Sequence, residues 1–208
     1  YGFNIESLET LKKDLDLFTA LNITHISTYC LQLEEKTILA NSQYQELGEE
    51  KIREQYDFIV DYLAKRGFYR YEVSNFSKQG FESKHNLIYW NNQEYGGVGL
   101  NASSYIDNVR RTNTKNLQEY LKGNYEDYEE VLSLADKEFY FLMLGLRKEK
   151  GISKQEYFNL FNKDIYINHS SLKELVVQGD IIDENGFIRI SPQKIFILDF
   201  ILRKLLFD

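Results

Sequence analysis

Apolar and polar residues follow two different periods along the first part of the chain. Apolar side chains recur every three or four positions over residues 8–21 and again over residues 49–65, which is typical of amphipathic helices. Two β-branched and aromatic runs, residues 23–31 and 69–74, predict strands, and residues 75–80 predict a turn. Because helices and strands alternate through short joints, the pattern predicts an α/β fold with parallel strands and crossover helices.

From about residue 133 the pattern changes to short helices. Three serines stand three positions before an acidic residue, which is the spacing of a capping box at the start of a helix. These pairs are Ser133 with Asp136, Ser153 with Glu156, and Ser171 with Glu174. Residues 181–190 predict a hairpin around an Asn-Gly turn, and residues 191–192 predict the start of a last helix. The inner stripe of that helix is Ile195, Leu198, Leu202 and Leu205.

Composition narrows the classes of protein that fit this pattern. The chain has 208 residues, a hydrophobic fraction of 43% and a net charge of −7. A net negative charge disfavours a nucleic-acid partner, because phosphate binding needs clustered Lys and Arg. No apolar run reaches the ~18 residues of a membrane span, and no segment resembles a signal peptide, so a cytoplasmic location is expected. The first residue is Tyr1 and not Met, which predicts a processed or shortened piece.

The cysteine content limits the metal chemistry of the chain. Cys30 is the single cysteine, and one thiol forms no internal disulfide and holds neither zinc nor an iron–sulfur cluster alone. We therefore expect no cofactor in this chain by itself, and we interpret Cys30 as a small apolar residue on a strand. The glycine-rich stretch at residues 96–99 lacks the Lys-Ser/Thr of a phosphate loop, so it predicts close packing.

Several stretches together resemble one family. The strongest are residues 71–76, Tyr-Glu-Val-Ser-Asn-Phe, and residues 85–90, which carry a His-Asn-x-x-Tyr-Trp motif. The weaker matches are residues 26–34, 97–99, 144–147 and 158–179. On these motifs the chain resembles the oxygen-independent coproporphyrinogen III oxidase-like radical-SAM family, closest to its HemW haem-chaperone branch. The resemblance covers almost the whole chain and implies its C-terminal portion only.

The resemblance implies a fold and a division into domains. Residues 1–110 would form part of a radical-SAM (β/α) barrel with its rim loops, and residues 111–132 a connecting segment. Residues 133–208 would form a small winged-helix-like α+β domain. Further barrel strands and a three-cysteine loop would lie upstream of Tyr1. The parent protein would carry a 4Fe-4S cluster, S-adenosylmethionine and haem.

The resemblance also implies candidate site residues. His85, Asn86, Tyr89 and Trp90 would bind haem, with His85 as the iron ligand, and Gln32 and Ser103 would help line the S-adenosylmethionine site. From the residue types alone, His85 is equally well a structural histidine that donates to a backbone carbonyl. His25 and His169 are interpreted as structural, and Glu34 as a residue that faces the barrel mouth or solvent. Asn101 and Ser103 depart from the family pattern Gly-Ala-His-Ser-Tyr.

Three functions remain open at this point. The first is a haem-binding chaperone whose partners are haem or porphyrin and a haem-accepting protein. The second is an oxygen-independent coproporphyrinogen III oxidase, an enzyme that decarboxylates coproporphyrinogen III oxidatively. The third is a winged-helix adaptor without a cofactor. Enzyme activity and oligomeric state are left open by the sequence.

Overall fold

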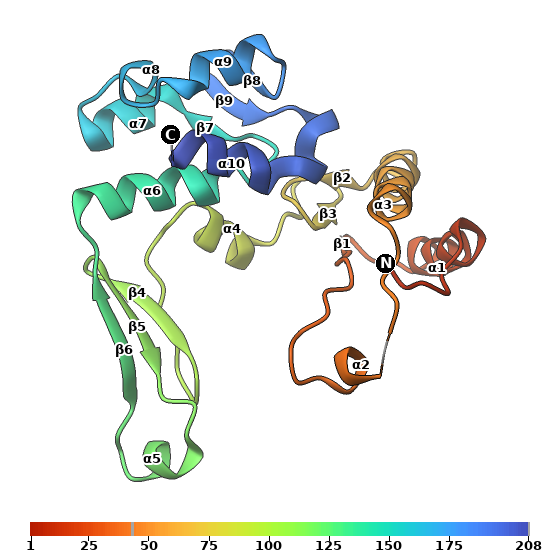
Figure 1. The fold of residues 1–208 in the computed structure, drawn as a ribbon, viewed down its shortest axis with the longest axis horizontal. Helices are drawn as coiled ribbons and strands as arrows, with labels where there is room; N and C mark the ends of the chain where they lie inside the picture. The colour runs from red at the N-terminus through yellow and green to blue at the C-terminus, as the bar shows by residue number, and fades with distance from the viewer. Residues whose placement is uncertain (43, 208) are drawn as a thin grey trace. The chain divides into compact units, whose positions relative to one another are not determined.

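The computed structural model describes residues 1–42 and 44–207. They form a mixed α/β structure that divides into two compact units, residues 1–83 (unit 1) and residues 84–208 (unit 2). Figure 1 shows the order of helices and strands along the chain. The boundaries expected from the sequence, after residues 110 and 132, fall inside unit 2 and stay a prediction.

Unit 1 contains the two long helices that the sequence predicts. Its elements are α1 Leu8–Ala20, β1 His25–Ser27, α2 Ile38–Asn41, α3 Glu49–Ala64, β2 Tyr69–Arg70 and β3 Asn75–Ser77. The Ser7 hydroxyl caps α1 by accepting the Thr10 amide, and the Thr10 hydroxyl faces the Ser7 amide in return. Gly67 follows α3 with a φ of 79°, a backbone conformation that glycine adopts without steric cost. Both helices are confirmed to within one residue at each end.

The sheet of unit 1 differs from the predicted parallel arrangement. Its order is β1-β3-β2, and β3 pairs with both neighbours in the antiparallel direction. The turn lies at residues 71–74, where the Tyr71 amide donates to the Asn75 carbonyl over 3.1 Å. The turn therefore begins four residues earlier than expected, at residue 71 instead of residue 75, and residues 75–77, predicted as part of a turn, form the central strand. β1 and β2 run in the same direction but do not pair with each other.

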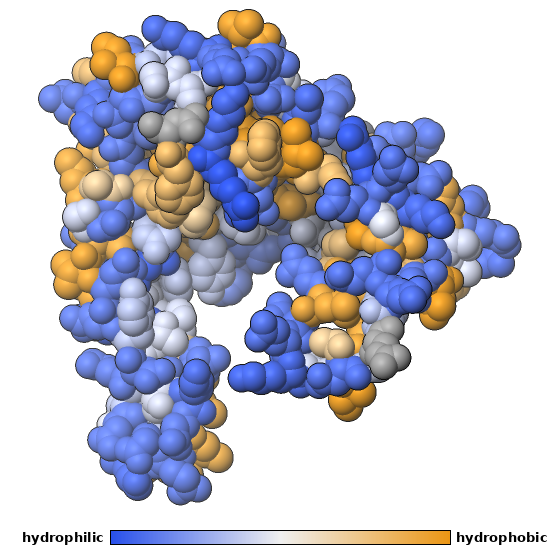
Figure 2. Space-filling model, viewed as in Figure 1, coloured by the Kyte–Doolittle hydropathy of each residue, from blue (hydrophilic) through white to orange (hydrophobic). Residues whose placement is uncertain are grey.

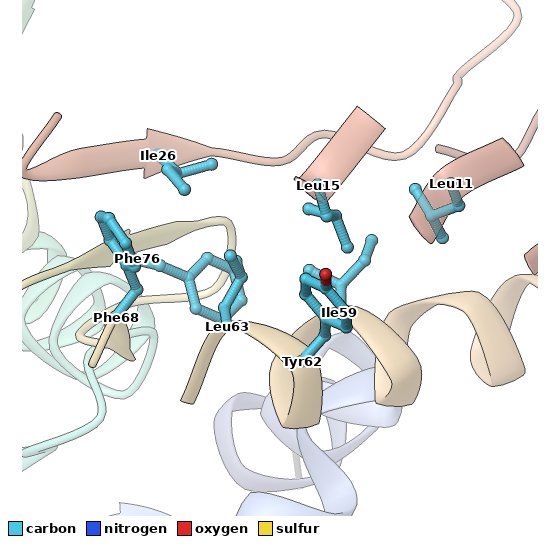
Figure 3. Close-up of a cluster of buried hydrophobic side chains, with 8 residues drawn as sticks. All are labelled: Leu11, Leu15, Ile26, Ile59, Tyr62, Leu63, Phe68 and Phe76. Carbon is cyan, nitrogen blue, oxygen red and sulfur yellow. The ribbon is translucent and has the colours of Figure 1, made fainter. Parts of the chain in front are cut away.

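The core of unit 1 joins both helices to this sheet. Figure 3 shows Leu11 and Leu15 of α1 directed at Ile59 and Tyr62 of α3. The other members of the cluster are Ile26, Leu63, Phe68 and Phe76. These apolar side chains leave water together, and this burial is the main favourable term in folding.

Unit 2 begins with a short helix and an antiparallel sheet. Its first elements are α4 Lys84–Trp90, β4 Ser103–Ile106, β5 Val109–Asn113, α5 Leu117–Leu121 and β6 Glu126–Val131. The strands pair in the order β4-β5-β6, and in Figure 1 α5 lies between β5 and β6 at the end of the sheet away from α6. The expected connecting segment, residues 111–132, therefore contains much of a sheet. Its strands lack apolar alternation, which is why the pattern did not reveal them.

The remainder of unit 2 follows the predicted succession of short helices and a hairpin. Its elements are α6 Leu134–Gly145, β7 Ile152–Ser153, α7 Lys154–Phe161, α8 Ile165–Asn168, α9 Ser171–Val177, β8 Ile181–Glu184, β9 Phe187–Ile190, the 3-10 helix η1 Pro192–Ile197 and α10 Leu198–Leu206. The strands pair in the order β7-β9-β8. The hairpin turn is confirmed, since Asn185 and Gly186 both have positive φ angles, 52° and 81°.

The structure confirms some of the predicted helix starts and contradicts one of them. The Ser133 capping box is confirmed, and the Ser153 hydroxyl accepts the amide of Glu156. The Ser171 capping box is wrong, because Ser171 is already the first helical residue of α9 and is buried. The closing helix starts at Pro192 as predicted, although its first six residues are a 3-10 helix. All four residues of its predicted inner stripe are buried.

Candidate functional site

Helix α4 carries the four residues that the sequence assigns to haem. His85 and Tyr89 are one turn apart, so their side chains share one face of the helix. The His85 Nε2 atom lies 3.1 Å from the Tyr89 hydroxyl oxygen, within hydrogen-bond distance. The two rings meet edge to face, with centroids 4.9 Å apart and an interplanar angle of 89°. His85 is exposed, which leaves its ring open to solvent.

A second aromatic contact supports Tyr89 from the sheet. The rings of Tyr89 and Tyr95 meet at a centroid distance of 4.6 Å and an angle of 73°. The backbone of Tyr95 pairs with Tyr105 of β4 through two hydrogen bonds of 2.9 Å each. Edge-to-face pairs of this kind contribute about 0.5–1.5 kcal/mol beyond their buried area. The side chain of Tyr89 is therefore held between His85 and a strand.

The other two candidates, Asn86 and Trp90, lie on the neighbouring face of α4, again one turn apart. Trp90 lines a cavity of about 10 Å³, together with Asn91, Phe141, Gly145, Lys148, Ile152 and Glu156. A cavity of this volume holds one water molecule at most. Trp90 therefore packs toward the elements that follow α4. The motif thus has two parts: His85 and Tyr89 on the accessible face, and Asn86 and Trp90 on the neighbouring face.

Lys148 is a polar member of this cavity that sequence reasoning missed. Its ammonium group donates to the Asn91 side-chain oxygen over 2.5 Å, which ties the end of α4 to the end of α6. Burial lowers the pKa of Lys148, while the nearby Glu156 carboxylate opposes that shift. The sequence signal that could have indicated this residue is its position directly after residues 144–147, which match the family.

The glycine-rich loop packs closely, as predicted. A Cβ atom on Gly97 would lie 2.1 Å from the carbonyl oxygen of Ser103, so no larger residue fits without movement of the backbone. The Gly97 amide donates to the Ser104 hydroxyl over 3.0 Å. Asn101 has a φ of 58°, the left-handed conformation that asparagine tolerates.

The two residues assigned to S-adenosylmethionine belong to different units. Gln32 is exposed in the loop after β1 in unit 1. Ser103 begins β4 in unit 2, where its hydroxyl oxygen lies 3.1 Å from the Thr112 hydroxyl oxygen on β5. Each residue is accessible within its own unit, and their assignment to one site stays a prediction.

The other histidines are less open than His85. The His25 Nε2 atom lies 2.9 Å from the Tyr71 hydroxyl, and both residues are half-buried in unit 1. His169 lies 3.1 Å from the Glu138 carboxylate and is also half-buried. The expectation that Cys30 lies on a strand is wrong, because β1 ends at Ser27. Cys30 is half-buried in the loop that follows, and burial raises the pKa of its thiol. Across residues 1–42 and 44–207, no three His, Cys, Asp or Glu side chains are placed to hold a metal ion together.

Comparison with solved structures defines the class of fold. The chain superimposes on coproporphyrinogen III oxidase HemN of Escherichia coli, a radical-SAM enzyme, with a TM-score of 0.79. The match covers 99% of this chain and 53% of the enzyme at 13% sequence identity. It shows that this chain has the fold of the matched part of that enzyme.

Comparison with curated sequences specifies the relatives, which are proteins named haem chaperone HemW. The Lactococcus lactis protein is 39% identical over 168 residues, which are 77% of this chain and 44% of that protein. The Bacillus subtilis protein is 31% identical over 204 residues, 93% of this chain and 54% of that protein. No family model matches the chain. The resemblance is confirmed: the chain is a homologue of HemW haem chaperones and spans about half the length of the relatives it matches.

Within the described residues, no helix is both long and apolar enough to cross a bilayer.

Proposed function

We propose that this chain is the C-terminal portion of a haem chaperone and that its cargo, haem, binds at the exposed face of α4. The observation that carries the proposal is the accessible His85 ring, the sole exposed histidine of the described chain, in a sequence homologous to HemW proteins. An imidazole nitrogen is a good axial ligand for haem iron. Tyr89 beside it supplies an aromatic edge that a flat macrocycle contacts favourably.

The residues present fit a ligand on the surface of α4. The cavity beside Trp90, about 10 Å³, has no room for a macrocycle. His85 and Tyr89 are the members of the motif that share the open face, so they would bind the cargo. Asn86 and Trp90 would orient the helix from the neighbouring face. An accessible site also suits a chaperone, which has to release haem to an acceptor protein.

The proposal extends to the architecture of the parent protein. We assign residues 1–110 to part of a radical-SAM (β/α) barrel with its rim loops, residues 111–132 to a connecting segment, and residues 133–208 to a winged-helix-like domain. The element order helix, strand, helices and hairpin supports the latter assignment. Helix α9 carries one cation, Lys173, next to the acidic Glu174, so it presents no cluster of cations to DNA. We place the parent protein in the cytoplasm.

A haem titration of the purified chain tests the proposal. Absorbance at the Soret band should show saturable binding by the wild type, and His85→Ala should weaken the affinity and shift the band. His25→Ala is the matched control, because His25 also contacts a tyrosine hydroxyl but is half-buried. It should bind haem as the wild type does. Equal binding by the wild type and His85→Ala would make His85 a structural residue and favour the oxidase or adaptor function.

A further inference from the structure

The hydrogen bond between His85 and Tyr89 constrains which nitrogen of the imidazole can face a ligand. An imidazole has two ring nitrogens, and a metal takes the one whose lone pair is free. In the described chain, the hydrogen bond of the His85 side chain is the one between Nε2 and the Tyr89 hydroxyl, at 3.1 Å. In the exposed ring, Nε2 is therefore engaged by Tyr89, and within the described residues Nδ1 forms no hydrogen bond.

We infer that Tyr89 is a positioning residue, which accepts the Nε2–H of His85 and so presents Nδ1 as the donor to haem iron. This inference rests on the proposed haem site. Metal-binding histidines almost always donate the N–H of their second nitrogen to a fixed partner, which sets the tautomer and the ring orientation. The Tyr89 oxygen fills that role here.

The partner is held rigidly enough to act in this way. Tyr89 packs edge to face against Tyr95, whose backbone pairs with Tyr105 of β4. The edge-to-face contact of Tyr89 with His85 itself fixes the plane of the imidazole at 89° to the phenol ring. The sheet thus supports Tyr95, Tyr95 supports Tyr89, and Tyr89 orients His85 before any ligand arrives.

Nuclear magnetic resonance of the haem-free chain tests the orientation. With 15N-labelled histidine at neutral or higher pH, a proton on Nε2 gives a nitrogen that couples to Hδ2 and Hε1 alike, and Nδ1 remains unprotonated. Tyr89→Phe should shift the Nε2 resonance and weaken this tautomer preference, because the acceptor oxygen is gone. Tyr95→Phe is the matched control: it removes a hydroxyl from the same aromatic row but leaves the His85 contact, so the His85 resonances should not change. A proton on Nδ1 in the wild type would overturn the inference.

The diamagnetic complex with ferrous haem and carbon monoxide tests the ligating atom. If iron binds Nδ1, the protonated nitrogen of His85 still couples to both ring hydrogens, and Tyr89→Phe lowers haem affinity by about 10- to 100-fold. A protonated nitrogen that couples to Hε1 alone would place iron on Nε2 and overturn the inference, while the proposed haem site would stand. An absence of haem binding by the wild type would instead overturn the proposed function and the inference with it.

Discussion

The antiparallel sheet and the helical region of unit 2 are stabilised in different ways. From α6 to α10 many apolar side chains are fully buried, among them Leu142, Leu172 and Ile201, each 0% exposed. In residues 103–131, which form the sheet and α5, the buried residues are Tyr105 and Thr114. On the face drawn in Figure 2, hydrophilic residues cover most of this sheet. The helical region therefore has an apolar core, whereas the sheet relies on backbone pairing and polar contacts.

Arg110 of β5 links the two regions. Its guanidinium lies 4.8 Å from the ring centroid of Tyr105 on β4 and 4.1 Å from that of Tyr140 on α6. It also donates to the Asn92 side-chain oxygen over 2.8 Å. A cation between two aromatic faces contributes about 0.5–2 kcal/mol per contact, depending on its exposure. Where the sheet meets α6, the contacts of a charged side chain therefore join two elements that buried apolar residues would join in the helical region.

The largest expected effect is the loss of core volume in the helical region. Leu142→Ala should lower the free energy of unfolding by about 2–5 kcal/mol, since it removes buried apolar surface and leaves a cavity. Urea denaturation followed by circular dichroism measures this change. The control is Val131→Ala on β6, where the side chain is 69% exposed and the expected change is within about 0.5 kcal/mol. Equal losses of unfolding free energy for both variants would contradict the difference in stabilisation between the helical region and the sheet.

A smaller effect is expected from the polar cluster around Glu138 of α6. The carboxylate is buried and accepts hydrogen bonds from Tyr157, from Lys163 over 3.2 Å and from Asn168 over 2.5 Å. His169 also lies against it. Burial by itself would raise the pKa of Glu138, but these donors outweigh burial and lower it. The cluster joins α6 to α7 and α8 through charge and not through apolar contact.

The sign of the pH effect follows from this lowered pKa. An unfolded glutamate takes up its proton near pH 4.3, above the pKa that Glu138 has in the folded chain. Glu138 therefore stabilises the folded chain at neutral pH, and this stabilisation is lost as the pH falls to about 4 and below. Glu138→Gln should cost about 1–3 kcal/mol at pH 7 and flatten the acid part of the stability curve. Unfolding curves of both proteins from pH 7 to pH 3 measure it, and parallel curves would refute the assignment.

The smallest effect is expected at an ion pair on the sheet itself. Arg111 of β5 and Glu129 of β6 stand opposite each other, with Nε and the carboxylate oxygen 2.8 Å apart and both side chains partly exposed. Cross-strand charge pairs at such sites contribute about 0.2–1 kcal/mol. A double-mutant cycle with Arg111→Ala and Glu129→Ala, read by amide hydrogen exchange in β5 and β6, should give a coupling in this range that shrinks at high salt. A coupling above 2 kcal/mol would show that the sheet depends on this pair.

The helices α1, α3 and α6 were predictable from the sequence because their signals are local, whereas the short helices α2, α4 and α5 were not predicted. The spacing of apolar residues and the Ser133 capping box depend on neighbours within one or two turns, and both were confirmed. The order of strands in unit 1 was not predictable, because it depends on a reversal at residues 71–74 that places β3 between β1 and β2. The sheet β4–β5–β6 was missed because residues 126–131 carry charges where a half-buried strand would alternate.

The candidate site shows the same division between local and distant information. The motif puts His85 and Tyr89 four positions apart in sequence, but it predicted no helix there. The structure places both residues in α4, where their polar atoms lie 3.1 Å apart. The contact of Tyr89 with Tyr95 and the position of Trp90 beside Phe141 depend on how α4 packs against later elements. Those contacts join residues far apart along the chain, so no pattern within the motif contained them.

The acidic strand β6 has a consequence for how copies of this chain meet in solution. It ends the sheet, so one side of its backbone offers N–H and C=O groups to any extended chain that approaches. Four of its six residues are Glu126, Asp127, Glu129 and Glu130. Two such edges repel each other at neutral pH, which disfavours strand exchange and fibre growth.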